Sequence, residues 1–544
     1  MKSAVLWLLG PEFPPGQRTG RGHLWARWIF LRALALIYFS AFYSFYFQIK
    51  GLIGPTGILP AVDYLKAVSG QLHSIRFWFA PTLLWLGAGD RALMAICWAG
   101  LIASVLVLFN VWPRVTLAIC FICFLSFIAA AQDFASYQSD GMLLAAGFLS
   151  PFLAAPGIRP GLGREHPPSR AIQFLLLWIW FRIYFESGVV KILSGDRSWR
   201  NFTAMDDYYQ NSPLPTWIGW YVQHLPHWFH AATVGLTFAV ELVLCWALFL
   251  PRRFRIACFC IVTPFQIGII LTGNYAFLNY IVLSLGFLLL DDQFVEWVIP
   301  RRIRERIGRQ PKKASSAAAP GAVPTVAPQA ANLSVNPRPA GAVAMAVSAV
   351  CLVWIFYATS AKLVWMFAPS APLPQQPVQW LEPFRIANQY GLFAVMTHAR
   401  YEIEFQGSQD GQNWIAYPFR YKPQNPAVAP GIYAPYQPRF EWNLWFASLG
   451  TWPQYRFVVW TEERLLTNDR DVLQLFAKNP FASAPPKEVR AVIYQYWFTS
   501  MKTKRETGMW WKRALLGIYA PVLEREPDGK IVLLDTPTVT PPSP

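Results

Sequence analysis

Charged residues are scarce in this chain of 544 residues. They make up 14% of it, whereas hydrophobic residues make up 54%. Soluble globular domains are usually about 25% charged and about 45 to 50% apolar. Acidic residues are the scarcer sign, with 30 Asp and Glu against 47 Lys and Arg. This composition argues against an ordinary soluble protein and indicates a multi-pass α-helical membrane protein.

Cysteine is also scarce. The seven cysteines all fall within apolar runs, and none follows Cys351. We therefore expect no disulfide framework in the C-terminal part of the chain. Cys120 and Cys123 have the spacing of a redox motif, but a thiolate is poorly solvated inside an apolar helix, so a redox role is not favoured.

Several common functional motifs are missing. The chain has no phosphate-cradling glycine loop, no Gly-x-Ser-x-Gly elbow and no His-Glu-x-x-His motif, so ATPase and hydrolase functions lose their usual sequence support. It also has no basic groove interleaved with aromatic residues, and nucleic-acid binding is not expected despite the net charge of +17. The N-terminal apolar stretch is too short for the apolar core of a cleaved signal peptide.

Long apolar runs, by contrast, are abundant. Counted against the roughly 20 residues that cross a bilayer core, they predict about nine spans. They are Trp28–Phe47, Ala92–Val111, Val115–Ala131, Gly141–Ala155, Ala171–Ile192, Phe229–Leu250, Ile256–Gly273, Tyr275–Leu290 and Ala342–Phe367. The fourth run is short and could be re-entrant.

Basic residues predict the orientation of these spans. Short cytoplasmic loops are enriched in Lys and Arg, and a cytoplasmic N-terminus places the basic clusters around Arg21, Arg164, Arg253 and Arg304 on one side. With nine spans, the segment after Pro369 then lies outside the cytoplasm.

These patterns divide the chain into six parts. They are a cytoplasmic N-terminal segment (1–27), an eight-span membrane body (28–290), a basic and then Ala/Pro-rich flexible cytoplasmic linker (291–341), a last transmembrane helix (342–367), an extracytoplasmic C-terminal domain (370–523) and a Pro-rich tail (524–544).

The C-terminal domain has the pattern of strands and turns. Polar and apolar residues alternate over 400–405, Asp410-Gly411 provides a turn, and 414–421 returns as a second strand. A helix is expected over Thr467–Lys478 and short strands over Val489–Phe498. We expect an α+β or β-sandwich-like domain.

The fifth apolar run contains Arg182, Glu186 and Lys191. A charge at the centre of a bilayer costs about 2.5 to 3.5 kcal/mol on insertion scales, so such residues are usually paired, interfacial or functional. Arg182 and Glu186 are one helical turn apart and can pair. Lys191 is turned away from Glu186; it either snorkels or acts as a base, with Glu186 or Asp196 setting its protonation. Glu241 in the sixth run or Arg32 in the first could neutralise a charge here.

A polar run follows the fifth span. It contains Asp196, Arg197, Trp199, Asp206 and Tyr208. Asp206 and Asp207 are adjacent, so they point to different sides of a helix or strand and make a poor acid and base pair. We expect this run to form a partner surface or a hydrogen-bonded cap.

Three histidines, His224, His227 and His230, recur every three residues. Zinc must be considered because residues three apart share a helix face. Pro226 interrupts the run and Trp217, Trp220 and Trp228 surround it, which favours an aromatic belt at the membrane interface. No metal or other cofactor is expected.

Ordered blocks along most of the chain resemble the lipase maturation factor family. They are Gly188–Trp199, Asn201–Pro215, His224–His230, Gly273-Asn274-Tyr275, Asp291-Asp292, Asn388–Phe393, Tyr433–Arg439, Asn479-Pro480-Phe481 and Trp510-Trp511. The resemblance extends from Trp28 to about Leu523.

This resemblance implies a multi-pass membrane factor that assists the folding and assembly of secreted lipases or other exported proteins. It implies no catalytic residues. Membrane lipids and an exported client are the expected partners, with Arg439, Trp442 and Trp445 on a client-binding surface of exposed aromatic residues. The chain shows no luminal retention tail, so we expect the bacterial inner membrane, or the endoplasmic reticulum membrane if the source is eukaryotic.

The N-terminal body is also distantly similar to the membrane part of vitamin K-dependent gamma-carboxylases. The similarity lies in residues 51–60 and in Gly188-Val189-Val190-Lys191. In those enzymes a lysine at this position is the catalytic base, so the alternative function is an integral membrane enzyme that uses Lys191. The similarity is short and the C-terminal domains differ.

Overall fold

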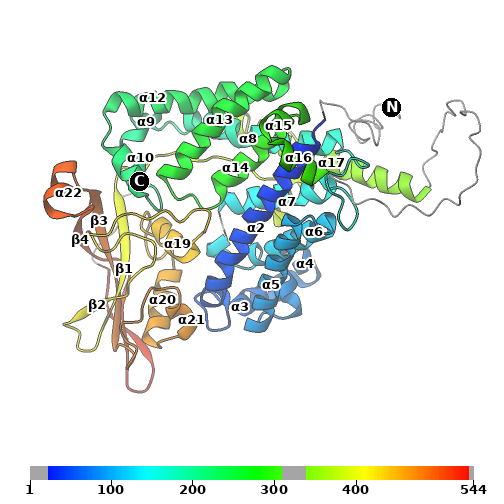
Figure 1. Ribbon diagram of the computed structural model, residues 1–544. Helices are drawn as coiled ribbons and strands as arrows, with labels where there is room; N and C mark the ends of the chain where they lie inside the picture. The colour runs from blue at the N-terminus through cyan, green and yellow to red at the C-terminus, as the bar shows by residue number, and fades with distance from the viewer. Residues whose placement is uncertain (1–21, 136, 309–338, 538–544) are drawn as a thin grey trace, which may run out of the picture.

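The computed structural model describes residues 22–135, 137–308 and 339–537, which form a helical body with a β-sheet domain at one end (Figure 1). Each of the nine predicted apolar runs contains helix. The helices are α2 (Leu24–Ile53), α5 (Asp90–Leu108), α6 (Pro113–Ile128), α7 (Gln138–Leu153), α8 (Arg170–Leu193), α12 (His227–Phe238) continued by η4 (Ala239–Val243) and η5 (Leu244–Phe249), α13 (Arg252–Thr272), α14 (Leu278–Gly286) continued by η6 (Phe287–Leu289), and α17 (Pro339–Phe367).

Five helices in the described residues are long and apolar enough to cross a membrane. They are Leu24–Ile53, Asp90–Leu108, His227–Phe249, Arg252–Thr272 and Ala346–Phe367. Two further apolar helices, Pro113–Ile128 and Leu278–Leu289, are shorter. Several spans are therefore present, but the count of nine is not confirmed.

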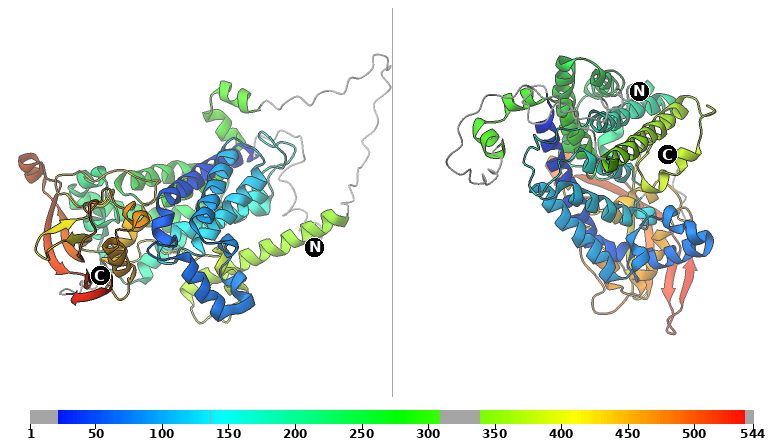
Figure 2. Two further views of the ribbon diagram at one scale, coloured as in Figure 1. Left: turned by 90° about the horizontal axis from the view of Figure 1, so that it is seen from below. Right: turned by 90° about the vertical axis from the view of Figure 1, so that its right-hand side faces the viewer.

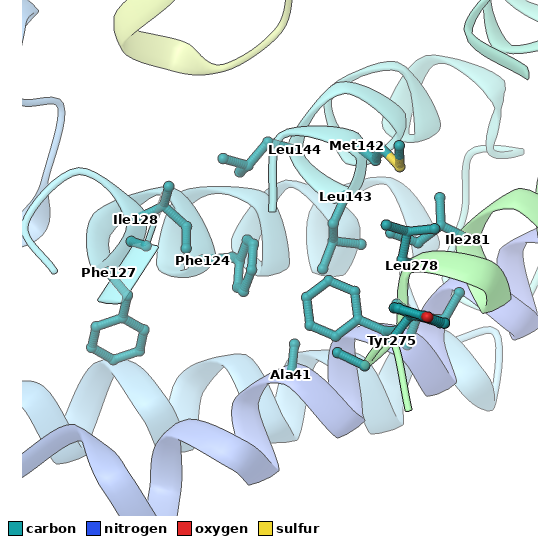
Figure 3. Packing of buried hydrophobic residues seen from close by; sticks show 14 of the residues in the cluster. Ala41, Phe124, Phe127, Ile128, Met142, Leu143, Leu144, Tyr275, Leu278 and Ile281 are labelled. Carbon is teal, nitrogen blue, oxygen red and sulfur yellow. The ribbon is translucent and has the colours of Figure 1, made fainter. Parts of the chain in front are cut away.

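The body is organised around α2, which is 30 residues long and largely buried. It packs against α5, α7 and α14. Figure 3 shows part of the shared core, to which Ala41 of α2, Phe124 of α6, Leu143 of α7 and Leu278 of α14 all belong. Because these side chains are almost all apolar, helix packing rather than polar contacts defines this part of the fold.

Short helices complete the body and the segment that leads to the sheet. They are α3 (Ala61–Leu72), η1 (His73–Ile75), α4 (Arg76–Phe79), η2 (Leu83–Leu86), η3 (Gln132–Ala135), α9 (Arg197–Arg200), α10 (Ala204–Asn211), α11 (Trp217–Gln223), α15 (Asp292–Val298), α16 (Arg301–Gly308), α18 (Gln376–Gln379) and η7 (Glu382–Phe384). The start of the predicted linker is thus helical, and its Ala/Pro-rich part lies outside the described residues.

The C-terminal domain contains one antiparallel sheet. Its strands are β1 (Arg400–Ser408), β2 (Trp414–Ala416), β3 (Glu488–Phe498), β4 (Trp511–Ile518), β5 (Val522–Arg525) and β6 (Ile531–Asp535). They follow the order β2-β1-β3-β5-β6, with β4 paired to the other end of β3. In the central pair Arg400 faces Tyr496 and Ser408 faces Glu488. The predicted hairpin is confirmed as β1 and β2, with Gly411 at φ +69° in its turn.

The structure corrects three details of the predicted domain. All six strands of the described residues lie in one sheet, so the fold is α+β and not a sandwich. The predicted helix over Thr467–Lys478 is shorter, because Asp469 caps α21 (Arg470–Leu473) and α20 (Phe457–Leu466) precedes it. Strand β6 lies within the predicted tail, so the domain continues to Asp535.

Helices join the sheet to the body. α19 (Arg439–Ala447) packs on β1 and also contacts α2, whereas α20 packs on β3 and α21 contacts α2. The remaining helix, α22 (Met501–Thr507), connects β3 to β4. Figure 2 shows the sheet domain at one end of the body and the long α17 along its side, where α17 packs against α8.

Candidate functional site

An irregular segment between α17 and β1 crosses the end of α8. We call residues 388–397 the strap. Six side chains of the body form hydrogen bonds with its backbone. Four donate to strap carbonyls: Arg182 Nη2 to Asn388 O (2.5 Å), Lys191 Nζ to Leu392 O (3.0 Å), Trp199 Nε1 to Phe393 O (3.0 Å) and Asn211 Nδ2 to Thr397 O (2.7 Å). Two carboxylates accept from strap N–H groups: Glu186 Oε2 from Tyr390 N (2.7 Å) and Asp196 Oδ2 from Met396 N (2.7 Å). Polar side chains of the fifth span and of the run that follows it thus fix the entry to the C-terminal domain.

Arg182 and Glu186 form the predicted one-turn ion pair. Arg182 Nε lies 2.6 Å from Glu186 Oε1, and both side chains are fully buried. The guanidinium also lies over the ring of Tyr390. Because each charge has a partner and a second hydrogen bond to the strap, both can be accommodated in an apolar environment.

Lys191 pairs with Glu241 of the next span and not with Glu186 or Asp196. Its Nζ donates to Glu241 Oε1 and Oε2 at 3.0 and 2.9 Å, and also to the Ser187 and Leu392 carbonyls. An ammonium has three donors and no acceptor, and all four neighbours are acceptors. The expectation that Glu241 neutralises a charge on this span is confirmed, and the geometry does not support an enzymatic use of Lys191. Arg32 instead stacks on Trp28.

A break in helical geometry places Glu241. The span that begins as α12 passes through the π-helical turn η4 and then through the 3-10 turn η5. π-helical turns are rare in proteins, and those that occur are often found at functional sites. Gly188 of α8 lies against this turn so closely that a Cβ there would be 2.7 Å from Leu242 Cδ2 and 2.9 Å from Glu241 Cβ. The absence of a side chain at residue 188 lets the two helices approach.

The polar run after α8 is divided between caps, buried contacts and surface. Asp196 caps α9 by accepting from Ser198 N at 2.8 Å. Burial raises the pKa of Asp196, but hydrogen bonds from the Met396 and Ser198 backbones outweigh burial, so its pKa lies below the ordinary value. The expectation of a hydrogen-bonded cap is confirmed here. Arg197 is exposed and Asp206 pairs with His227 at 3.0 Å.

The prediction that two aromatic residues of this run, Trp199 and Tyr208, lie on a partner surface is wrong, because both are buried. Trp199 is 1% exposed and Tyr208 is 7% exposed. Trp199 packs against Phe238 of α12 and donates to the strap, whereas Tyr208 packs against Tyr275 and Phe393. Burying aromatic rings between packed elements stabilises the fold, which is why these two rings are not on the surface.

The expected aromatic surface on the C-terminal domain also needs correction. Arg439 is fully buried, and its Nη1 and Nη2 lie 2.8 and 2.7 Å from the carboxylate of Asp140 in the body. Trp442 is 7% exposed and Trp445 is half-buried. These residues lie on α19, which faces the body, so docking of the domain covers them.

Two cavities lie on either side of the strap. The membrane cavity, about 550 Å³, lies among α8, α12, α13 and α14 and is lined by Lys191 and Glu241. The junction cleft, about 590 Å³, lies between the body and α19 and is lined by Trp442 and Trp445. Leu278, Leu392 and Phe393 line both.

The junction cleft combines aromatic walls with free hydrogen-bond donors. Its aromatic lining comprises Tyr137, Tyr275, Phe393, Trp442, Trp445, Phe446 and Tyr455. Trp442 Nε1 and Asn443 Nδ2 are buried and have no hydrogen-bond partner among the described residues. Buried donors are normally satisfied, so these two favour a ligand that brings acceptor oxygens into the cleft.

The three histidines do not converge. His224 contacts the Trp220 and Thr499 carbonyls, His227 pairs with Asp206, and His230 contacts the Leu225 carbonyl. Within the described part of the chain, no group of three or more His, Cys, Asp or Glu side chains is placed to hold a metal ion.

Sequence reasoning did not identify the strap or the free donors of the cleft. The block Asn388–Phe393 was noted in the sequence as a motif. The strap meets the polar side chains of the body through its backbone atoms, and such contacts leave no pattern of residue types in the sequence. Asn443 stands in an aromatic stretch, and only the docked structure shows that its amide oxygen accepts from Tyr137 while its amide nitrogen lacks a partner among the described residues.

Comparison with protein families gives two matches that together cover most of the chain. A model described as the lipase maturation factor transmembrane domain matches residues 25–297, and one described as the lipase maturation factor C-terminal domain matches residues 386–521. With the five candidate spans, the first match shows a multi-pass membrane protein.

Curated relatives agree with these matches. Lipase maturation factor 1 of Bos taurus is 31% identical over 547 residues, covering 95% of this chain and 94% of the relative. Lipase maturation factor 2 of Gallus gallus is 31% identical, covering 91% and 81%. Lipase maturation factor 1 of Homo sapiens is 29% identical, covering 95% and 92%. No solved structure gives a significant match.

Proposed function

Because this chain belongs to the lipase maturation factor family, we propose that it is a membrane-embedded factor that assists the folding and assembly of a secreted lipase or a related exported protein. The junction cleft carries this proposal. It offers aromatic walls and two buried N–H donors without partners, which suit an extended segment of a client whose backbone carbonyls are not yet paired.

A client of this kind has to meet the cleft outside the cytoplasm. The distribution of Lys and Arg supports an N-terminus in the cytoplasm and a C-terminal domain on the other side. The bacterial inner membrane is the proposed location, with the endoplasmic reticulum membrane as the equivalent in a eukaryotic source.

The proposed role is holding the client, not disulfide exchange. Five of the seven cysteines are buried, and the other two, Cys260 and Cys351, lie on α13 and α17 among apolar residues. The C-terminal domain has no cysteine. The factor therefore acts by keeping aromatic and backbone groups of the client from pairing wrongly, without covalent chemistry.

The test is the activity of a co-expressed secreted lipase. The double variant Trp442→Phe with Asn443→Leu removes both donors and keeps bulky side chains, and we expect it to lower the yield of active lipase several-fold. Trp497→Phe on β3, which does not line the cleft, is the matched control. Unchanged lipase activity with a correctly folded double variant would contradict the proposed role of the cleft.

A further inference from the structure

The membrane cavity opens toward the flank of the body. Leu236 of α12 and Ile261 of α13 line it and are 44% and 45% exposed. Both residues lie on helices long and apolar enough to cross a membrane. Pro264 lies inside α13 beside the cavity, and proline in a helix interior bends the helix. The mouth of this cavity therefore faces the acyl chains of a bilayer.

Three polar side chains, joined by hydrogen bonds, line the inner part of this apolar cavity. Gln266 Nε2 donates to Tyr184 Oη at 2.7 Å, and Gln266 Oε1 accepts from Asn279 Nδ2 at 2.8 Å. All three residues line the cavity and are more than nine-tenths buried. Polar groups at membrane depth are costly and usually have a function.

This row of hydrogen-bonded side chains ends in a free acceptor at Asn279 and a free donor at Tyr184. In the part of the chain that the structure describes, the side-chain amide oxygen of Asn279 (Oδ1) accepts no hydrogen bond and the Tyr184 hydroxyl donates none. An acceptor and a donor thus face the same cavity. A hydroxyl and an ester carbonyl on one ligand would satisfy both.

The charge of the site selects an uncharged head. Lys191 and Glu241 neutralise each other, and the remaining polar lining residues, such as Gln266 and Asn279, carry no charge. A phosphate or carboxylate would enter without a free cation to compensate it, which is costly in a dry site. We infer that the membrane cavity binds an uncharged glycerolipid, with an acyl chain along the apolar wall and its hydroxyl and ester groups at Asn279 and Tyr184.

Photolabelling of the purified full-length protein in phosphatidylcholine nanodiscs tests this inference. The probe is a diacylglycerol with a diazirine in its acyl chain. We expect labelling of cavity residues on α12 and α13 that an excess of unlabelled diacylglycerol removes. Diazirine-bearing phosphatidylcholine and fatty acid, tested in parallel, should label the outer surface without this competition.

Two variants separate the cavity from the surface. Gly268 of α13 lines the cavity, and a Cβ there meets no atom within 4 Å. Gly268→Phe can therefore fill the cavity without displacing the backbone and should lower competable labelling at least five-fold. Ile267→Phe, at an exposed neighbour that does not line the cavity, should leave it unchanged.

Three results would overturn the inference. They are labelling by diacylglycerol that excess diacylglycerol does not compete, equal competable labelling by phosphatidylcholine, and competable labelling that Gly268→Phe does not lower. None of these readouts depends on a lipase. The lipid-binding inference can therefore fail while the proposed maturation function stands, and the maturation function can fail while lipid binding stands.

Discussion

At the scale of single residues, the charges of the fifth span act as partners for other parts of the chain. Arg182 and Glu186 pair with each other and with the strap, and Lys191 pairs with Glu241 and with the strap. A buried ion pair contributes little net stability, but removing one partner leaves a buried charge and costs about 3 to 5 kcal/mol. These residues therefore hold the strap in position on the body. Replacing one partner of a pair should be damaging, whereas replacing both should be tolerated.

We expect Lys191→Met to destabilise the protein by about 3 to 5 kcal/mol, because Glu241 is left buried without its partner. The double variant Lys191→Met with Glu241→Met should recover most of this loss and most of the maturation activity, since two apolar side chains then replace the pair. Thermal unfolding in detergent and the activity of a co-expressed lipase measure the two effects. A stable double variant that has no activity would restore the case for a chemical role of Lys191.

Glu462 on α20 predicts a pH dependence. The side chain is fully buried and neither carboxylate oxygen has a hydrogen-bond partner among the described residues, so burial raises its pKa well above the ordinary 4.5. A raised pKa gives stability that is present below about pH 4.5 and is lost as the pH rises toward the folded-state pKa. Glu462→Gln should therefore raise the unfolding temperature more at pH 8 than at pH 5, by about 2 to 4 °C for each kcal/mol.

Unfolding curves of both proteins at the two pH values measure this difference. Asp528, an exposed carboxylate in the turn between β5 and β6, provides the control variant Asp528→Asn, which should shift neither curve. An equal shift for Glu462→Gln at pH 5 and pH 8 would show that the carboxyl group does not titrate as described.

At the scale of elements, the feature that matters is the change of helix type in the sixth span. The π-helical turn η4 directs Glu241 toward α8, and Gly188 allows the contact. Both depend on close approach between two helices, and small residues at helix interfaces in membranes provide it.

Gly188→Ala should weaken the protein although alanine is the better helix former. The added Cβ would lie within 3 Å of Leu242 and Glu241, so α8 and η4 must separate, and we expect a loss of about 1 to 3 kcal/mol. Gly235→Ala on α12, where the nearest atom is 3.8 Å away, should be neutral or stabilising by up to about 1 kcal/mol. Similar unfolding temperatures for the two variants would contradict this account of η4.

Sequence patterns were sufficient for elements whose signal is local. Apolar runs predict helices because a membrane span needs length and hydrophobicity, and the alternation over 400–405 predicts β1 because side chains alternate across a sheet. The single sheet and β6 could not be predicted, since strand pairing depends on partners far apart in the sequence. Likewise, Glu241 was identified as a possible counter-charge, but the π-helical turn that brings it to Lys191 has no residue pattern of its own.

At the scale of the whole molecule, the C-terminal domain is docked on the body by a buried ion pair. Arg439 of α19 joins Asp140 of α7 and also lies over the ring of Phe45 in α2. The strap makes a second connection. Because the cleft is formed between these two parts, its shape depends on docking.

Arg439→Met should loosen this docking, because Asp140 would remain buried without a partner at a cost of about 3 to 5 kcal/mol. We expect faster limited proteolysis of the strap and the junction in the full-length protein. Lys502→Met, which breaks a pair with Glu506 on α22 whose side chains are 83% and 60% exposed, should cost about 1 kcal/mol or less and leave the proteolysis pattern unchanged. Identical digestion of both variants would argue against a docking role for Arg439.

The most direct test of the account is capture of the client at the junction cleft. Val395 of the strap lines the cleft and is 56% exposed, whereas Ile415 of β2 is 51% exposed and does not line it. A photo-crosslinking amino acid placed at each position in the full chain, with a co-expressed secreted lipase, compares the two sites. The account predicts a lipase adduct at residue 395 and little or none at residue 415; no adduct at residue 395, or equal adducts at both, would contradict it.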